Sequence, residues 1–162
     1  MKTSFLILAA IISIHTSWAQ LKTTPVCPVF VVDVLEGDVN KYSPKSTLGE
    51  IKKAFPCFTE SVDVSTSSTC AGVFYKNKDI YFYTDRNYIE IRQNFKGKLS
   101  LPLLGAGRNS LFKTLGNPKL KDVNWDAFQT KYGILVLYYN KAGKINKLQM
   151  STRGTESLKL CE

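Results

Sequence analysis

Alternating apolar and polar residues recur along the chain from residue 29 onward and predict a protein built mainly of strands. Residues 29–35 are rich in β-branched side chains, which favour an extended backbone. Turn residues at 77–78 and 140–143 predict antiparallel hairpins on either side. Five further segments show the two-residue period of strands: residues 72–76, 79–84, 88–92, 133–139 and 144–151.

Two short segments have the period of an amphipathic helix instead. The first covers residues 46–56, with Ser46 or Thr47 as its N-cap, an acidic residue in the first turn and Pro56 at its end. The second lies within residues 105–118, where glycine and proline again stop the helix. Both are predicted to pack one apolar face against the strands.

Two polar stretches between these elements are predicted to be loops. Residues 59–69 are rich in serine and threonine, and residues 119–132 lack a sustained apolar period. We expect Trp125 and Phe128 to fill the core beneath the second loop.

The order of helix, loop and antiparallel strands occurs twice, in residues 43–92 and 105–151. Ile51 of the first copy aligns with Leu111 of the second, and both copies stop at a proline. The alternatives are a duplicated unit or a chance alignment. Either way, the sequence predicts an α+β fold: a single domain of residues 20–162 with an antiparallel sheet and short helices on one face.

This arrangement resembles the β-lactamase inhibitor proteins and the small outer-membrane assembly lipoproteins, which repeat a similar helix-loop-sheet unit. The resemblance lies in residues 48–70 and 109–118, together with the strands that follow them. The second copy lacks a cysteine pair matching Cys57 and Cys70, and the lipid-bearing cysteine of the lipoproteins is missing. The resemblance implies a curved sheet whose exposed face grips a partner protein and acts by occlusion.

One face of the predicted sheet carries residues that are common in binding surfaces. In the strands at 79–84 and 88–92, isoleucine and phenylalanine alternate with tyrosine and charged residues. Tyrosine and arginine are frequent in interface hot spots, although tyrosine also suits the wet side of an ordinary strand. The predicted partner-binding residues are Tyr81, Tyr83, Tyr88, Glu90 and Arg92.

The first nineteen residues have the composition of a cleavable signal peptide. Lys2 precedes an apolar run at residues 5–12, and a small-x-small cleavage site ends before Gln20. The apolar run is too short for a membrane anchor, which needs about 20 residues, and no later transmembrane segment is predicted. The protein is therefore expected to be periplasmic or secreted.

All four cysteines follow the predicted leader. An even number of cysteines in a small exported domain predicts two disulfides rather than a metal site, since CxxC pairs are lacking. Three pairings are possible. The short polar loop between Cys57 and Cys70 favours a bridge between them, which leaves Cys27 to join Cys161 and tie the two ends together.

Catalytic chemistry finds little support in the sequence. The only histidine, His15, lies in the predicted leader, so Ser-His and Cys-His triads are excluded after cleavage. The glycines at residues 104–109 lack the spacing of a phosphate loop, and no spacing marks Asp122 and Asp126 as a carboxylate pair. We predict a non-enzymatic binding protein without a cofactor, such as an inhibitor or immunity-type factor that covers a partner protein.

The chain carries a net charge of +9, with 22 basic and 13 acidic residues. A region between Glu90 and Asp122 contains basic residues and no acid. It is either a solvated surface or a site for anionic envelope components, such as lipid head groups or cell-wall polymer; nucleic acid is not expected. The basic residues are Arg92, Lys96, Lys98, Arg108, Lys113, Lys119 and Lys121.

Overall fold

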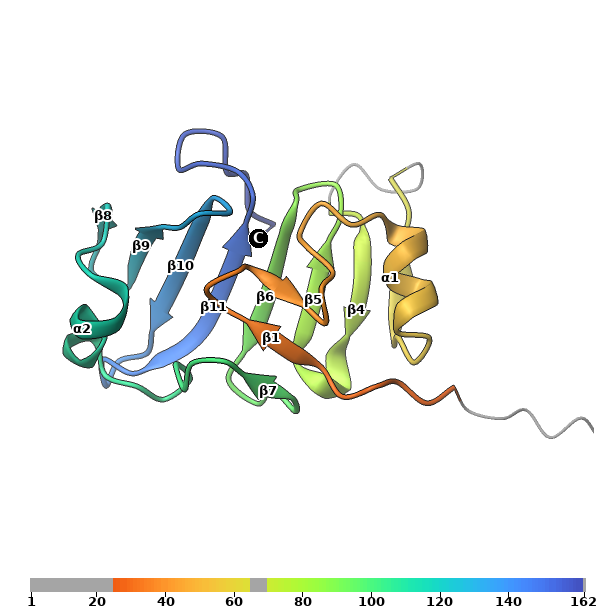
Figure 1. Cartoon of the computed structure of the whole chain (residues 1–162), viewed down its shortest axis with the longest axis horizontal. Helices are drawn as coiled ribbons and strands as arrows, with labels where there is room; N and C mark the ends of the chain where they lie inside the picture. Colours follow the sequence, from red (N-terminus) through yellow and green to blue (C-terminus); the bar gives the residue numbers. More distant parts are fainter. Residues whose placement is uncertain (1–24, 65–69, 162) are drawn as a thin grey trace, which may run out of the picture.

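An eight-stranded antiparallel sheet forms the centre of the protein, as seen in a computed structural model that describes residues 25–64 and 70–161 (Figure 1). The strand order is β3-β4-β5-β6-β11-β10-β9-β8. With only two short α-helices among the described residues, the predicted α+β fold is confirmed. The strand bounds are β3 Glu60–Val62, β4 Gly72–Tyr75, β5 Ile80–Tyr83, β6 Tyr88–Arg92, β8 Leu120–Lys121, β9 Trp125–Gln129, β10 Ile134–Tyr139 and β11 Ile145–Ser151.

The two halves of the sheet meet at the pairing of β6 with β11, where Ile89 lies opposite Met150 and Ile91 opposite Leu148. In each half a helix precedes four strands, and the strand order of one half mirrors that of the other. The helices are α1 (Leu48–Ala54) and α2 (Phe112–Leu115). Descent of the halves from a duplicated unit remains a prediction.

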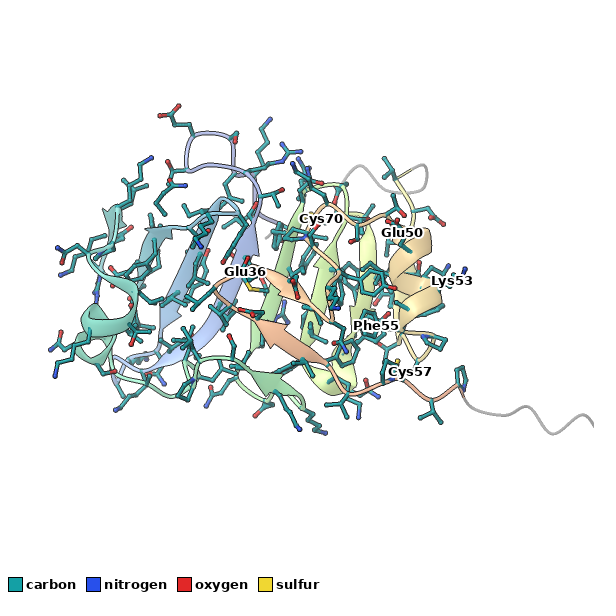
Figure 2. The ribbon with its side chains drawn as sticks, viewed as in Figure 1. Glu36, Glu50, Lys53, Phe55, Cys57 and Cys70 are labelled. Atoms are coloured by element: carbon teal, nitrogen blue, oxygen red, sulfur yellow. A yellow bond between two sulfur atoms is a disulfide. The ribbon has the colours of Figure 1, made fainter. Side chains whose placement is uncertain are left out.

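Helix α1 begins with a capping box formed by Thr47 and Glu50. The Thr47 hydroxyl accepts from the Glu50 amide at 3.3 Å, and the Glu50 carboxylate accepts from the Thr47 amide at 2.8 Å. These bonds lower the pKa of Glu50. Figure 2 shows Phe55, the residue at the end of the helix, facing the sheet, while Lys53 points away from it.

The second predicted helix is shorter than the sequence pattern indicated. A 3-10 turn at Arg108–Ser110 precedes the four residues of α2. Gly105 and Gly116 have φ angles of +79° and +73° on either side, a conformation that ends regular helix.

Both predicted loops contain strands, so these two predictions are wrong. β3 lies within residues 59–69, and β8 and β9 lie within residues 119–132. The alternation of β9 was hidden because Asp126 occupies one of its buried positions. An apolar pattern cannot predict a buried carboxylate whose partner is distant in sequence.

A small sheet and both helices cover one face of the large sheet, which we call the helix side (Figure 1). The small sheet has the order β2-β1-β7, with β1 at Val31–Asp33, β2 at Asp38–Val39 and β7 at Lys98–Leu99. The main core lies beneath it. The rings of Phe30 and Phe55 stack there with centroids 4.7 Å apart, and the Tyr75 hydroxyl donates to the Phe55 carbonyl at 2.7 Å.

The opposite face, here called the far side, is crossed by the end of the chain. We call residues 152–161 the C-terminal strap. Leu160 and Cys161 pack against a cluster of aromatic side chains from β4, β5 and β6, and Leu158 packs against Ala127 and its neighbours. The strap therefore covers part of a sheet face that would otherwise be open.

The two disulfides join Cys27 to Cys57 and Cys70 to Cys161, with Cα atoms 5.3 and 5.9 Å apart. The prediction that all four cysteines are oxidised is confirmed, but the favoured pairing is wrong. Cys27 and Cys57 pack on the helix side, whereas Cys70 and Cys161 pack on the far side. The large sheet thus separates Cys57 from Cys70, and a disulfide requires Cα atoms within about 7 Å.

Two disulfides fit an exported protein, because such bonds persist in oxidising compartments. No helix in the described part of the chain is long and apolar enough to cross a membrane. The predicted signal peptide lies outside the described residues.

Candidate partner-binding face

The predicted binding residues all come from β5 and β6 on the far side, as their alternation indicated. Their exposure is uneven. Tyr88 and Glu90 are 0% and 2% exposed, Tyr81 and Tyr83 are also buried, and only Arg92 is well exposed. Four of the five residues are therefore buried, and the three tyrosines belong to the cluster that packs against the strap.

The strap contributes to the burial of the tyrosines. Tyr83 and Tyr88 stack with ring centroids 4.4 Å apart, and the Tyr88 hydroxyl accepts from the Cys161 amide at 3.0 Å. Burial raises the pKa of Tyr88 well above its usual value. This end of the face is consequently occupied by the protein's own C-terminal residues.

A polar network lies at the centre of the far side, around the buried carboxylate of Glu90. Glu90 is paired in register with Tyr81 on one strand and Gln149 on the other. The Gln149 amide donates to Glu90 at 2.7 Å, and the Tyr138 hydroxyl donates to Gln149 at 2.9 Å. A buried carboxylate is costly without such partners, so this network fixes the centre of the face.

Two cations flank Glu90, and each lies over a tyrosine ring. Arg92 and Lys147 are opposite each other on β6 and β11. Arg92 Nε is 2.5 Å from one Glu90 oxygen, and Lys147 Nζ is 3.9 Å from the other. Arg92 lies 4.1 Å from the centre of the Tyr81 ring, and Lys147 lies 4.0 Å from that of Tyr138. We call these four residues the cation–tyrosine row: Tyr81, Arg92, Lys147 and Tyr138.

The two cations of the row remain accessible, whereas Tyr81 is buried. The side chains of Arg92 and Lys147 are 45% and 33% exposed. Burial lowers the pKa of Arg92, but the hydrogen bond and charge of Glu90 outweigh it and leave a net increase. Burial raises the pKa of Tyr138 to about 12, so its hydroxyl stays protonated at neutral pH and can donate to Gln149.

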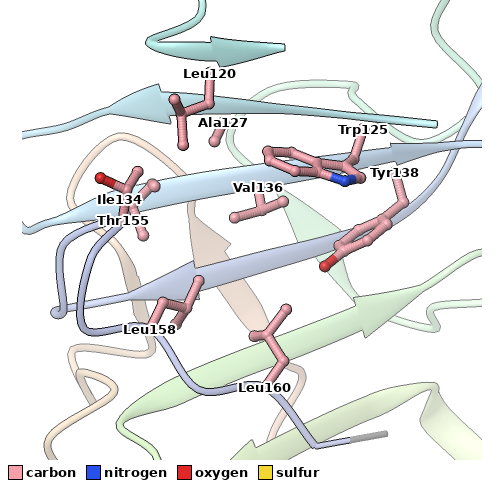
Figure 3. Close-up of a pocket in the computed structure, with 9 residues that line it drawn as sticks. All are labelled: Leu120, Trp125, Ala127, Ile134, Val136, Tyr138, Thr155, Leu158 and Leu160. Carbon is pink, nitrogen blue, oxygen red and sulfur yellow. The ribbon is translucent and has the colours of Figure 1, made fainter. Parts of the chain in front are cut away.

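An apolar hollow of about 200 Å³ lies beside the row, between the sheet and the strap (Figure 3). Figure 3 shows Val136 between the aromatic pair Trp125 and Tyr138 and the strap residues Thr155 and Leu158. One wall thus belongs to β9 and β10 and the other to the C-terminal strap.

A larger polar hollow of about 870 Å³ adjoins the row at the ends of β6, β10 and β11. Its lining includes Arg92, Lys141 and Lys147, with Asp79 as its one acid. Asp79 accepts from the Asn94 amide at 2.9 Å with one oxygen, and the Tyr81 hydroxyl lies 3.5 Å from the other. Its charge is therefore partly satisfied within the fold.

The two carboxylates considered for catalysis, Asp122 and Asp126, both make structural contacts. Asp122 accepts from the Val123 amide. Asp126 lies on the helix side, ion-paired with Arg108, and accepts from the Tyr139 hydroxyl at 2.8 Å. Glu90 lies on the far side of the sheet. Within the described ranges, no group of three or more His, Cys, Asp or Glu residues is placed to hold a metal ion.

The basic region does not form one continuous surface. Arg92 pairs with Glu90 on the far side and Arg108 with Asp126 on the helix side. The lysines of the region are divided among β7, α2, β8 and the turns beside them. Binding of anionic envelope components through this region remains a prediction.

Sequence reasoning missed half of the cation–tyrosine row. Tyr138 and Lys147 belong to strands whose alternation was recognised, but the pairing of β11 with β6 that brings them beside Glu90 was not. Phe128 is in the core as predicted, whereas Trp125 lies half-buried on the far side and lines the apolar hollow. Trp125 immediately precedes Asp126, so its outward position follows once β9 is recognised as a strand.

Compared with known proteins, the chain matches no family model, no curated protein and no solved structure at a significant level. The resemblance to the β-lactamase inhibitor proteins therefore stays a prediction based on the order of elements.

Proposed function

We propose that this exported, disulfide-stabilised protein acts by binding a partner protein through the far side of its sheet, without catalysing a reaction. The observation that carries the proposal is the cation–tyrosine row beside an apolar hollow. Tyrosine and arginine at a partly desolvated surface are typical of interface hot spots, and an adjacent apolar hollow supplies a place for an anchoring side chain.

The row is also held in place before any partner arrives. Glu90, Gln149 and the stacking tyrosines restrict Arg92 and Lys147. A surface that is already ordered loses little side-chain entropy on association, which favours tight binding. Inhibition or immunity by covering a partner's site is the role that such a rigid face supports.

Site-specific photo-crosslinking tests the proposal. A photoreactive phenylalanine analogue at Tyr138 places the label on the proposed face, and the same residue at Lys53 places it on the outer surface of α1. In extracts of exported proteins from the source cells, we expect one protein to be crosslinked from Tyr138 and not from Lys53. Equal labelling from both positions, or none from Tyr138, would contradict a binding role for the far side.

Binding of anionic lipid or cell-wall polymer is the competing function. Sedimentation with anionic vesicles or isolated cell walls that weakens as salt rises would support it instead. Exchange of Lys96, Lys98, Lys119 and Lys121 for glutamine should abolish such sedimentation if the basic region is responsible.

A further inference from the structure

We propose that the far side holds a two-part site for an acidic segment of the partner that carries an apolar side chain. The apolar hollow takes the side chain, and Lys147 with Arg92 takes a neighbouring carboxylate. This inference rests on the proposed function, since it specifies the chemistry of the protein partner.

The two parts are contiguous because Tyr138 belongs to both. Its ring lines the apolar hollow together with its cross-strand neighbour Trp125. The same ring lies against Lys147, and Tyr138 also lines the polar hollow. A peptide that inserts one side chain beside Trp125 therefore places an adjacent side chain near Lys147.

Charge selects an acidic partner. Arg92, Lys141 and Lys147 surround the polar hollow, while Glu90 and Asp79 are the acids nearby. Both acids already accept hydrogen bonds within the fold. The excess of cations has the same sign as the net charge of +9 on the whole chain, so the electrostatic field draws acidic segments toward this face.

The apolar hollow admits a side chain and little more. Its volume of about 200 Å³ is below the range of about 300–1,000 Å³ that small-molecule pockets occupy. Its lining is apolar apart from Thr155 and the polar atoms of Trp125 and Tyr138. An aliphatic residue such as leucine fits this lining.

The apolar part depends on the strap, whereas the cationic part does not. Thr155, Leu158 and Leu160 form one wall of the hollow. The strap is fastened by the Cys70–Cys161 disulfide and by the bond from the Cys161 amide to Tyr88. Opening this disulfide should remove the wall while leaving Lys147 and Arg92 on their strands.

The fluorescence of Trp125 gives a direct readout. The chain has two tryptophans, and Trp18 lies in the predicted leader, so Trp125 is the sole indole of the processed protein. The probe is an eight-residue peptide in which a single leucine is flanked by glutamate and aspartate. One control peptide has serine in place of leucine, and another has lysine in place of the acids.

We expect the acidic leucine peptide to change Trp125 emission saturably, with at least tenfold weaker binding by the serine peptide and none by the lysine peptide. Lys147→Glu should weaken binding at least tenfold, and Ala127→Leu, which fills the hollow, at least fivefold. Lys53→Glu makes the same charge change on α1 and should alter binding less than twofold. Circular dichroism confirms that each variant is folded.

Removing each disulfide in turn gives a second pair of matched variants. A variant with Cys70 and Cys161 changed to alanine should lose the preference for leucine over serine but retain the preference for acids over lysines. A variant with Cys27 and Cys57 changed to alanine should retain both preferences at a temperature where it is folded. A folded Cys70/Cys161 variant that still prefers leucine would overturn the role of the strap.

Failure of this inference is distinct from failure of the proposed function. No response of Trp125 to millimolar acidic peptide, or equal binding of the lysine peptide, would overturn the two-part site. The crosslinking experiment can still succeed in that case, because a partner of different chemistry would be captured from Tyr138. Absence of crosslinking from Tyr138 would instead contradict the proposed function.

Discussion

The backbone amide of Cys161 donates a hydrogen bond to the hydroxyl of Tyr88, 73 residues earlier in the sequence, at 3.0 Å. Beside it, Cys161 is bonded to Cys70, which lies just before β4. The last residues of the chain are thereby fixed across strands from the first half of the sheet. This attachment shapes the far side, because the strap both buries the tyrosine cluster and walls the apolar hollow.

The disulfide pairing can be checked by proteolysis without reduction. Mass spectrometry should find Cys27 linked to Cys57 and Cys70 linked to Cys161, since the sheet separates the other combinations. The same digest after reduction and alkylation serves as the control. A Cys57–Cys70 crosslink as the main species would contradict the arrangement of the two faces.

Tyr88→Phe should loosen the strap without opening the disulfide. The change removes the acceptor for the Cys161 amide and should lower the free energy of unfolding by about 1 kcal/mol. Trypsin should also cleave more readily at Arg153 and Lys159. Tyr81→Phe is the matched control, since the Tyr81 hydroxyl has only a long contact of 3.5 Å to Asp79. Equal cleavage of both variants would argue against the hydrogen bond as a fastening.

Arg108→Ala should be strongly destabilising. The guanidinium pairs with Asp126, which is 1% exposed, and donates to the Asp122 carbonyl at 2.6 Å. Removing one member of a buried ion pair leaves an uncompensated charge and costs about 3–5 kcal/mol, measured by urea unfolding.

Lys76→Ala breaks the exposed pair with Glu60 and provides the comparison for Arg108→Ala. The side chains of this pair are 60% and 42% exposed, so its loss should cost about 1 kcal/mol or less. A small effect of Arg108→Ala, similar to that of Lys76→Ala, would show that the Asp126 site is not a structural anchor.

Alkaline pH should destabilise the protein through its buried tyrosines. Burial raises the pKa of Tyr138 to about 12 and raises those of Tyr75, Tyr88, Tyr132 and Tyr139 further still. The unfolded chain loses tyrosine protons near pH 10, whereas the folded chain keeps them. Stability from these groups is therefore complete below pH 10 and falls as pH rises above it.

Absorbance at 295 nm measures this difference directly. Most tyrosines of the folded protein should ionise well above pH 10, and all should ionise near pH 10 in urea. The Tyr138→Phe variant should show a shallower loss of stability between pH 10 and 12. A native titration that coincides with the one in urea would be inconsistent with this packing.

Local features of the chain were predictable because their causes are local. The alternation of Tyr81 and Tyr83 with Ile80 and Phe82 placed each residue on the correct face of β5, since side chains alternate in any strand. Thr47 and Glu50 are three residues apart, so the capping box depends only on the start of α1. Oxidation of the cysteines likewise followed from their number and the predicted leader.

The tertiary structure decided what depends on pairing between distant strands. Lys147 lies opposite Arg92 because β11 pairs with β6. Asp126 can be buried because Arg108, from a different segment, pairs with its carboxylate. Residues 152–161 show no apolar period from which their position could have been predicted. Their position depends on the disulfide to Cys70 and the hydrogen bond to Tyr88. The sequence alone determines which face of its own strand a residue occupies, whereas strand order decides which faces, cysteines and charges meet.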